Sequence, residues 1–325
     1  MTHSSISHWF DPFIQNGLRP IKTLGVGGTC EVILVEREDG SRYALKRILT
    51  PFRLHRASRD LLLYEGVHLS LVKSPRIISC YQVIRSVLPE AHLLKQFHQN
   101  PLQNPQSRSE RYDEVILLLE YIEGITLRSL LIQCRSHQPP LQREEVASFI
   151  WDIVNGLRAL QDAKKSDGRP CPIVHGDLNP SNVMVRPNGA STLIDLSAAS
   201  SPLINQSKIH RRGPFKYRCP QDPGDLDGEV DDFYSLGCLW FELVTGSLPP
   251  KEAVISSQEL RAAGWPRDWS LSVTGLLSKN GARRRECFRS LDRDVIWGGD
   301  RSQHAQKKTI ARRTLAQRVK LTPVL

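Results

Sequence analysis

The chain has 325 residues, of which 40% are hydrophobic, and its formal net charge is +10. This apolar content is enough for a sizeable core and excludes wholesale disorder, and the lack of any run of about 18 apolar residues predicts no membrane span. The first residues have neither the basic nor the apolar segment of a signal peptide, and the seven cysteines are scattered without a CxxC pair, so we expect reduced thiols in a cytoplasmic protein.

The N-terminal third of the chain predicts strands. We expect a short leader over residues 1 to 18 and then three strands within residues 19 to 49. The second and third of these strands are separated by Glu-Asp-Gly at positions 38 to 40, and an Asp-Gly turn is typical of a hairpin. Residues 56 to 73 carry apolar side chains at helical spacing, which predicts one helix after the hairpin.

Two further strands are predicted on either side of a polar segment. They cover residues 77 to 87 and 114 to 121. The residues between them, 88 to 113, are rich in Gln, Asn, Pro and Ser, which is typical of a surface insert. The residues up to position 122 therefore predict a small lobe with an antiparallel sheet and one helix.

The chain becomes helical after Gly124. Residues 144 to 161 repeat apolar side chains every three or four positions, and a second apolar helix is predicted over residues 231 to 245. We therefore expect an α+β, bilobal fold with a larger, mostly helical lobe over residues 123 to 290. Ligands bind most often in clefts between lobes, so the predicted arrangement favours a ligand site there.

Most of the net positive charge lies in a basic tail over residues 291 to 325 and the segment before it. From Ala282 to Leu325 there are 12 Lys and Arg residues against 4 Asp and Glu residues. A solvated tail is one interpretation, and an acidic partner, nucleic acid or anionic lipid is another. Residues 303 to 320 predict a basic helix, whose thin apolar stripe at positions 310, 315 and 319 gives only weak support to membrane binding.

A glycine-rich turn and a Lys-Glu pair are the first candidates for chemistry. The segment LGVGGTCEV, Leu24 to Val32, places three glycines between two strands, where backbone N–H groups approach phosphates closely. Lys46 lies on the following strand, and Glu65 on the predicted helix is the carboxylate that would hold it. Taken alone, the turn is also compatible with a plain hairpin, and the two charges with unrelated surface residues.

The segment HGDLNPSN supplies a stronger signal. It places Asp177 and Asn182 five residues apart, and TLIDLS places Asp195 after a predicted strand. These side chains offer one proton acceptor and two hard oxygen ligands of the kind that Mg²⁺ prefers when it bridges nucleotide phosphates.

In this order the motifs resemble those of eukaryotic-type protein kinases, over roughly residues 18 to 284. The resemblance extends to LLLEYIEG, GPFKYRCPQ, DDFYSLGCLWFELVTG and LLSKNGARR, and it implies an ATP-dependent protein serine/threonine kinase acting on a protein substrate. By the resemblance, Asp177 orients the substrate hydroxyl and accepts its proton. Lys46, paired with Glu65, holds the α- and β-phosphates of ATP.

The resemblance also implies the remaining site residues. Asn182 and Asp195 would bind Mg²⁺. Asp232 would brace the catalytic loop, and Arg284 would pair with the end of the activation segment. The residues implied in binding ATP, from the glycine-rich loop, the strands around adenine and the hinge, are Leu24, Gly25, Val26, Gly27, Gly28, Thr29, Cys30, Val32, Ala44, Lys46, Glu120, Ile122 and Met184.

Several positions depart from the family pattern. Cys30 replaces the third loop glycine, and Gly176 replaces the Arg that meets a phosphorylated activation loop, so we expect no dependence on phosphorylation through that Arg. Ser197 follows Asp195 and Leu196 where the family has Gly, and Gln221 replaces a Glu that would pair with Arg284.

The most consequential departures are Asn179 and Pro214, which stand where serine/threonine kinases carry Lys and Thr. Loss of a charge contact to the moving phosphoryl group slows such a reaction by about 10²-fold or more. Two alternatives to an active protein kinase therefore stay open. One is a nucleotide-binding pseudokinase or scaffold. The other is a small-molecule kinase of the aminoglycoside or choline phosphotransferase type, because HGDLNPSN also resembles the catalytic loop of those enzymes.

Overall fold

The computed structural model describes residues 17–49, 52, 55–88, 112–136, 138–204, 215–220, 228–250 and 255–321. All but the last two residues of the predicted leader and most of the predicted insert lie outside these residues, as do Pro214 and Gln221. The chain divides into two compact units. The first contains residues up to Ser70 together with Ser79–Tyr121, and the second contains Leu71–Ile78 and the residues from Ile122 onward.

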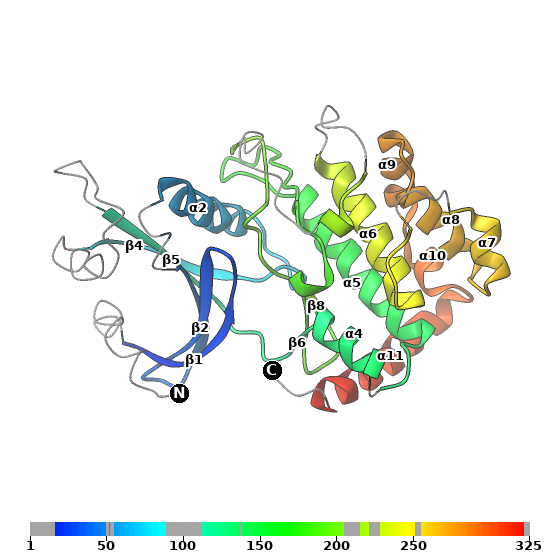
Figure 1. The fold of residues 1–325 in the computed structure, drawn as a ribbon, viewed down its shortest axis with the longest axis horizontal. Helices are drawn as coiled ribbons and strands as arrows, with labels where there is room; N and C mark the ends of the chain where they lie inside the picture. The colour runs from blue at the N-terminus through cyan, green and yellow to red at the C-terminus, as the bar shows by residue number, and fades with distance from the viewer. Residues whose placement is uncertain are drawn as a thin grey trace. The chain divides into compact units, whose positions relative to one another are not determined.

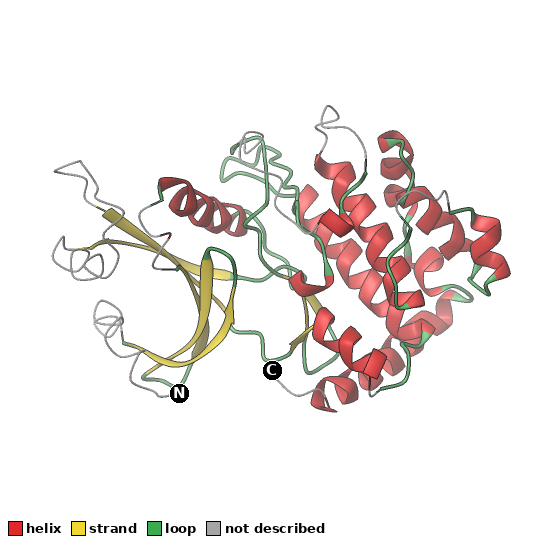
Figure 2. Ribbon diagram, viewed as in Figure 1, coloured by secondary structure: helices red, strands yellow, loops and turns green. Residues whose placement is uncertain are grey.

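The first unit is a five-stranded antiparallel sheet with one helix (Figures 1 and 2). The order of its strands is β1-β2-β3-β5-β4. The bounds of its elements are β1 Leu18–Val26, β2 Cys30–Arg37, β3 Arg42–Ile48, α2 Arg56–Ser70, β4 Cys80–Leu88 and β5 Tyr112–Glu120. The predicted hairpin, the helix and both later strands are therefore confirmed.

Both faces of this sheet pack against apolar side chains. The core on one face contains Leu18, Ile33, Val35, Leu45, Ile116 and Leu118. Helix α2 packs against β3, β4 and β5. Gly66 lets the helix approach closely, because a Cβ there would lie 2.7 Å from Val83 and 2.8 Å from Leu117. The position of α2 on the sheet fixes where Glu65 lies.

The strand predicted from residue 77 begins at Cys80 instead. Ile77 and Ile78 belong to the second unit, where Ile77 forms a bridge with Leu193 and the Ile78 N–H donates to Leu193 O at 3.0 Å. The sequence pattern did not separate these positions from the strand, because buried apolar residues look alike in both settings.

The second unit is mostly helical, with a three-stranded sheet of order β6-β7-β8 (Figure 2). Its strands and 3₁₀ turns are β6 Ile125–Thr126, η4 Pro180–Asn182, β7 Val183–Val185, β8 Ser191–Leu193 and η5 Phe215–Tyr217. Its helices are α4 Leu127–Ser136, α5 Arg143–Gln161, α6 Gly228–Thr245, α7 Ser257–Ala262, α8 Arg267–Leu276, α9 Gly281–Ser290, α10 Arg293–Trp297 and α11 Arg301–Leu321. The expected bilobal α+β fold is confirmed.

Helix α5 is the centre of this unit and packs against β8, α6, α10 and α11. Its buried residues include Phe149, Ile150, Ile153 and Val154, which are fully enclosed. An aromatic pair joins two of the surrounding helices. Phe233 of α6 stacks on Phe288 of α9 with ring centroids 4.2 Å apart. Burial of these side chains is the main stabilising contribution to the unit.

The predicted basic helix forms α11, and it packs on α5 (Figure 1). Its buried apolar residues are Ala311, Leu315 and Val319, four residues apart, whereas Ile310 is 51% exposed. The predicted stripe was wrong at Ile310, because five residues of helix turn it about 140° away from Leu315. Within the described residues, no helix combines the length and the hydrophobicity that crossing a membrane requires.

Candidate active site

Lys46 and Glu65 form a buried ion pair in the first unit. The Lys46 Nζ lies 2.9 Å from Oε1 and 2.7 Å from Oε2 of Glu65. Their side chains are only 8% and 1% exposed. The structure thus brings together the predicted pair and excludes the interpretation as unrelated surface charges. Because a buried charge without its partner is costly, the ammonium group of Lys46 stays next to the carboxylate of Glu65.

The glycine-rich turn joins β1 and β2. Leu24, Gly25 and Val26 lie on β1, and Gly25 pairs with Val32 of β2. Among the described residues, no atom lies within 4 Å of a Cβ built on Gly25 or Gly28, and neither glycine has a positive φ. Neither packing nor backbone conformation therefore accounts for these glycines. Their absent side chains leave the backbone accessible to a ligand.

The other predicted nucleotide-binding residues are divided between the units. Val32 on β2 lies opposite Lys46 on β3, and Ala44 lies opposite Leu119 of β5. Glu120 is the last residue of β5, in the first unit. The predicted residues of the second unit are Ile122 and Met184, the latter on β7.

Two amides hold the carboxylate of Asp177. The Asn179 Nδ2 donates to Asp177 Oδ1 at 2.9 Å, and the Asn182 Nδ2 donates to Asp177 Oδ2 at 2.8 Å. Both amides also donate to the Asp177 backbone oxygen, at 3.1 and 2.9 Å. Asn179 is at the same time the N-cap of η4, because its Oδ1 accepts the Ser181 N–H. Asn179 therefore orients Asp177, which the sequence did not indicate.

Asp232 of α6 braces the segment before Asp177. Its carboxylate accepts the N–H groups of His175 at 2.7 Å and Gly176 at 2.9 Å. Gly176 has a φ of 76°, and a Cβ there would lie 2.4 Å from Ala198 O. Only glycine fits this backbone, so an Arg at this position would require the loop to change its conformation.

The β7–β8 hairpin places Asp195 close to Asn182. Val183 pairs with Leu193, and the Ile194 N–H donates to Asn182 O at 2.9 Å. Asp195 has a φ of 64°, a conformation that is uncommon outside glycine, and its Oδ1 accepts the Ser197 N–H at 3.1 Å. Strained backbone of this kind concentrates at functional sites.

The surroundings of Asp177 raise the pKa of its carboxyl group to about 6. Burial is the main cause, and the charge of Asp195 adds to it. The hydrogen bonds from Asn179 and Asn182 lower the pKa, as does the charge of Arg218. A proton acceptor in this range is suited to catalysis near neutral pH.

The side chains of Asn182 and Asp195 fit a magnesium ion. Both supply oxygen atoms, and the Asn182 Nδ2 is already bonded to Asp177, so its oxygen is the atom left for a cation. Within the part of the chain that the structure describes, no group of three or more His, Cys, Asp or Glu side chains could hold a metal. This donor set suits Mg²⁺, which is usually bound by one or two protein groups with substrate phosphates and water.

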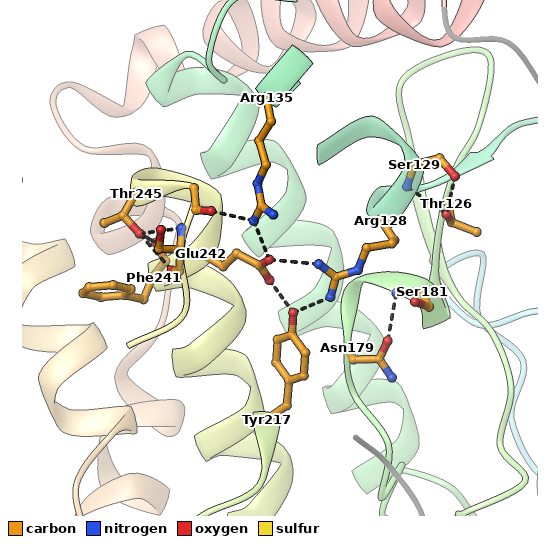
Figure 3. Close-up of polar contacts among 12 residues, drawn as sticks. Thr126, Arg128, Ser129, Arg135, Asn179, Ser181, Tyr217, Phe241, Glu242 and Thr245 are labelled. Carbon is orange, nitrogen blue, oxygen red and sulfur yellow. Dashed lines mark hydrogen bonds and ion pairs between the residues drawn. The ribbon is translucent and has the colours of Figure 1, made fainter. Parts of the chain in front are cut away.

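A polar network anchors η5 to α4 and α6 (Figure 3). The Glu242 carboxylate of α6 accepts from Arg128 at 2.9 Å and from Arg135 at 3.1 Å, and the Tyr217 hydroxyl donates to it. The Ser235 hydroxyl donates to Tyr217 O at 2.9 Å. In the sequence, the feature that could have predicted this network is a Glu within the apolar run of α6, because a buried acid requires hydrogen-bonding or charged partners. One helix thus holds both the segment before Asp177 and the segment around Tyr217.

Arg284 was predicted to contact Gln221, which lies outside the described residues. Its guanidinium donates to Ser278 O at 2.7 Å and to Lys279 O at 3.2 Å, and it contacts the Cys219 Sγ at 3.5 Å. Arg284 therefore contacts Cys219, two residues before Gln221.

Comparisons with known proteins identify one family. A family model described as protein kinase domain matches residues 18–268. The chain is 25% identical over 215 residues to the serine/threonine-protein kinase PrkC of Bacillus subtilis, covering 61% of this chain and 31% of that protein. It is 32% identical over 140 residues to PknL of Mycobacterium tuberculosis, covering 41% and 31%. It is 27% identical over 138 residues to the probable kinase PknB of Lactococcus lactis, covering 41% and 20%. The matched regions span a third or less of these relatives.

Proposed function

Because the chain belongs to the protein kinase domain family, we propose that it transfers the γ-phosphoryl group of Mg-ATP to a serine or threonine hydroxyl of a protein. The observation that carries the proposal is the carboxylate of Asp177, which is fixed by the amides of Asn179 and Asn182 and lies within the electrostatic influence of Asp195. The relatives reported above are named serine/threonine-protein kinases, which supports this class of substrate.

In the proposed reaction, the substrate hydroxyl oxygen forms a bond to the γ-phosphorus while the bond to the β-phosphate oxygen breaks, and ADP leaves. Asp177 orients the hydroxyl and accepts its proton. Lys46, fixed by Glu65, holds the α- and β-phosphates, and Asn182 and Asp195 would hold Mg²⁺, which neutralises phosphate charge when bound. Positioning and charge stabilisation supply most of such a rate enhancement.

The proposal assigns the remaining residues to the nucleotide. Backbone groups from Gly25 to Cys30 would cover the phosphates, and the openness around Gly25 and Gly28 supports this. Backbone groups at Glu120 and Ile122 would bind adenine, whose faces would meet the apolar side chains of Leu24, Val32, Ala44 and Met184.

One observation favours a catalytically silent nucleotide-binding protein as the second candidate. Asn179 stands in place of a cationic side chain, and its amide is bonded to Asp177 instead. An uncharged amide does not neutralise a moving phosphoryl group. Under this alternative, Mg-ATP would raise the melting temperature without any transfer.

The proposal is tested by incubating the purified chain with γ-labelled ATP, Mg²⁺ and a mixture of protein and small-molecule acceptors. We expect label in phosphoserine or phosphothreonine of protein, and its loss when EDTA removes the metal. Label in sugars or choline would instead support a small-molecule kinase, and binding without transfer would support the pseudokinase alternative.

The pH dependence of the reaction should report Asp177. Since its pKa is raised to about 6, kcat/KM should rise as pH increases through about 6, where the carboxylate loses its proton, and level off above pH 7. Initial rates at limiting ATP between pH 5 and 8 measure this limb. A rate that falls over this range would show that the deprotonated form of Asp177 is not the active one.

Replacement of Asn179 by alanine should lower kcat by about tenfold or more, because a hydrogen bond to a charged group contributes about 1.5–3 kcal/mol. The acidic limb of the pH profile should also shift upward, since the hydrogen bond from Asn179 lowers the pKa of Asp177. Asn188→Ala is the matched control, because Asn188 caps an exposed turn through Ala190 N. An unchanged pH limb in Asn179→Ala would refute the positioning role.

A further inference from the structure

Five basic side chains lie on or next to one buried carboxylate in the second unit. The carboxylate belongs to Asp152 of α5, whose side chain has no exposed surface. We call the group the Asp152 basic cluster, and its members are Arg76, Arg186, Arg293, Lys308 and Arg312.

Two arginines bind the carboxylate directly. The Arg76 Nη2 lies 3.1 Å from Asp152 Oδ1, and the Arg312 guanidinium of α11 donates to Oδ2. The Ser191 N–H also donates to Oδ2, at 2.8 Å. The Arg76 and Arg312 side chains are 20% and 15% exposed, so each guanidinium is fixed yet reaches the surface.

Two further cations of the cluster have no acidic partner in the part of the chain that the structure describes. Among the described residues, Lys308 and Arg293 form no ion pair, and Arg293 lies over the ring of Trp151 at 5.3 Å. Burial lowers the pKa of Lys308, and the charge of Asp152 opposes that shift. The charges of Arg312, Arg76 and Arg293 lower it further.

Arg186 completes the cluster from β7–β8. Its Nε donates to the Thr192 hydroxyl at 2.8 Å, and that hydroxyl donates to Pro75 O at 3.3 Å, next to Arg76. Burial lowers the pKa of Arg76, and the charges of Arg312 and Arg186 lower it further.

The fold alone does not require this excess of positive charge. Arg76 and Arg312 already offset the single charge of Asp152, so Lys308 and Arg293 bring further positive charge next to like charges. Three members of the cluster come from residues 293 to 312, beyond the residues 18–268 that match the family model. Three of the five cations of the cluster thus lie outside the matched domain, whereas Asp152, Arg76 and Arg186 lie within it.

We propose that the Asp152 basic cluster binds a phosphate monoester carried by a phosphorylated protein. A dianion suits an excess of several cations, and fixed guanidinium groups bind phosphate with little ordering cost. Arg76 and Arg312 meet at Asp152 from two different elements, and Lys308 and Arg293 lie close enough to them to affect one another electrostatically. A nucleic acid or a membrane surface would instead require a row or a broad plane of cations.

The test measures binding to the full chain in the absence of ATP, so its outcome is independent of phosphoryl transfer. The probe is a short fluorescein-labelled peptide of Gly and Ser with one central phosphoserine, followed by fluorescence anisotropy. We expect the Lys308→Ala/Arg293→Ala variant to bind about tenfold more weakly or worse, from the loss of charge-assisted contacts. Neither side chain touches Asp152, so α11 should stay in place.

The matched control is Arg313→Ala/Lys320→Ala, which removes the same charge from exposed positions of the same helix and should bind like the parent chain. Equal binding of the unphosphorylated peptide, or unchanged binding in Lys308→Ala/Arg293→Ala, would overturn the proposal. Inorganic phosphate that binds as tightly as the peptide would indicate a free anion as the ligand. Tighter binding of single-stranded oligothymidylate or phosphatidylserine vesicles at the same residues would reassign the cluster to polyanions. Both results also overturn the proposal.

Discussion

Replacement of Asp177 by alanine is expected to lower the rate of phosphoryl transfer by about 10²- to 10⁴-fold, the range for loss of a general base. The carboxylate receives Asn179 at Oδ1 and Asn182 at Oδ2, so its orientation is set before a substrate arrives. Alanine removes the proton acceptor but leaves the bond from Ser181 N to Asn179 Oδ1, which caps η4. The loss should therefore appear in kcat, with little change in the KM for ATP.

Single-turnover transfer from γ-labelled ATP measures this loss, and the melting temperature without nucleotide checks that the variant folds. Asp167→Ala is the matched control, because Asp167 is an exposed aspartate of the same unit whose main partner is Arg169. It should transfer phosphate at the rate of the parent chain. An Asp177→Ala variant as active as the parent chain would contradict the proposed role of Asp177 and with it the proposed mechanism.

The sequence predicted the fold because each element carries its own local signal. The alternation and turn chemistry of residues 19 to 49 predict the hairpins, and the helical spacing of apolar residues predicts α2, α5 and α6. The residues alone named Glu65 as the candidate partner of Lys46 but left unrelated surface charges open, since 19 residues separate the two, and the family resemblance favoured the pairing.

The sequence did not predict which residues far apart in the chain form ion pairs with each other. Arg318 and Glu145 are 173 residues apart, and Arg312 and Asp152 are 160 apart. A basic helix with four-residue spacing predicts an amphipathic element, but not that its arginines point inward to acids of α5. Tyr217 and Glu242 form a similar case, because a hydroxyl and a carboxylate carry no signal for each other.

The departures at Gly176 and Asn179 show what the sequence could not supply. Both were identified as losses of a cationic side chain. The structure shows that the backbone at Gly176 admits no side chain, and that Asn179 has gained two hydrogen-bonded roles. Whether a substitution is a loss depends on the contacts that the new residue makes, and these are tertiary.

Replacement of Arg318 by alanine is expected to lower the free energy of unfolding by about 3–5 kcal/mol, the cost of leaving a buried charge without its partner. The Arg318 Nε and Nη2 donate to the two oxygens of Glu145 at 2.6 and 3.0 Å, and Glu145 is 1% exposed. Arg318 also donates to Pro139 O at 2.8 Å and Pro140 O at 3.1 Å. The substitution therefore removes the contacts that join α11 to the start of α5.

Urea denaturation of four chains, the parent, Arg318→Ala, Glu145→Gln and the double variant, measures the coupling of the pair. We expect the double variant to lose less stability than the sum of the single variants. The reason is that Glu145→Gln removes the buried negative charge that Arg318→Ala leaves without a partner. Lys320→Ala, at an exposed position of α11, should change the free energy by about 0.5 kcal/mol or less. A cost below about 1 kcal/mol for Arg318→Ala would mean that α11 is held by its apolar stripe alone, and that the inward arginines of this helix contribute little to the domain.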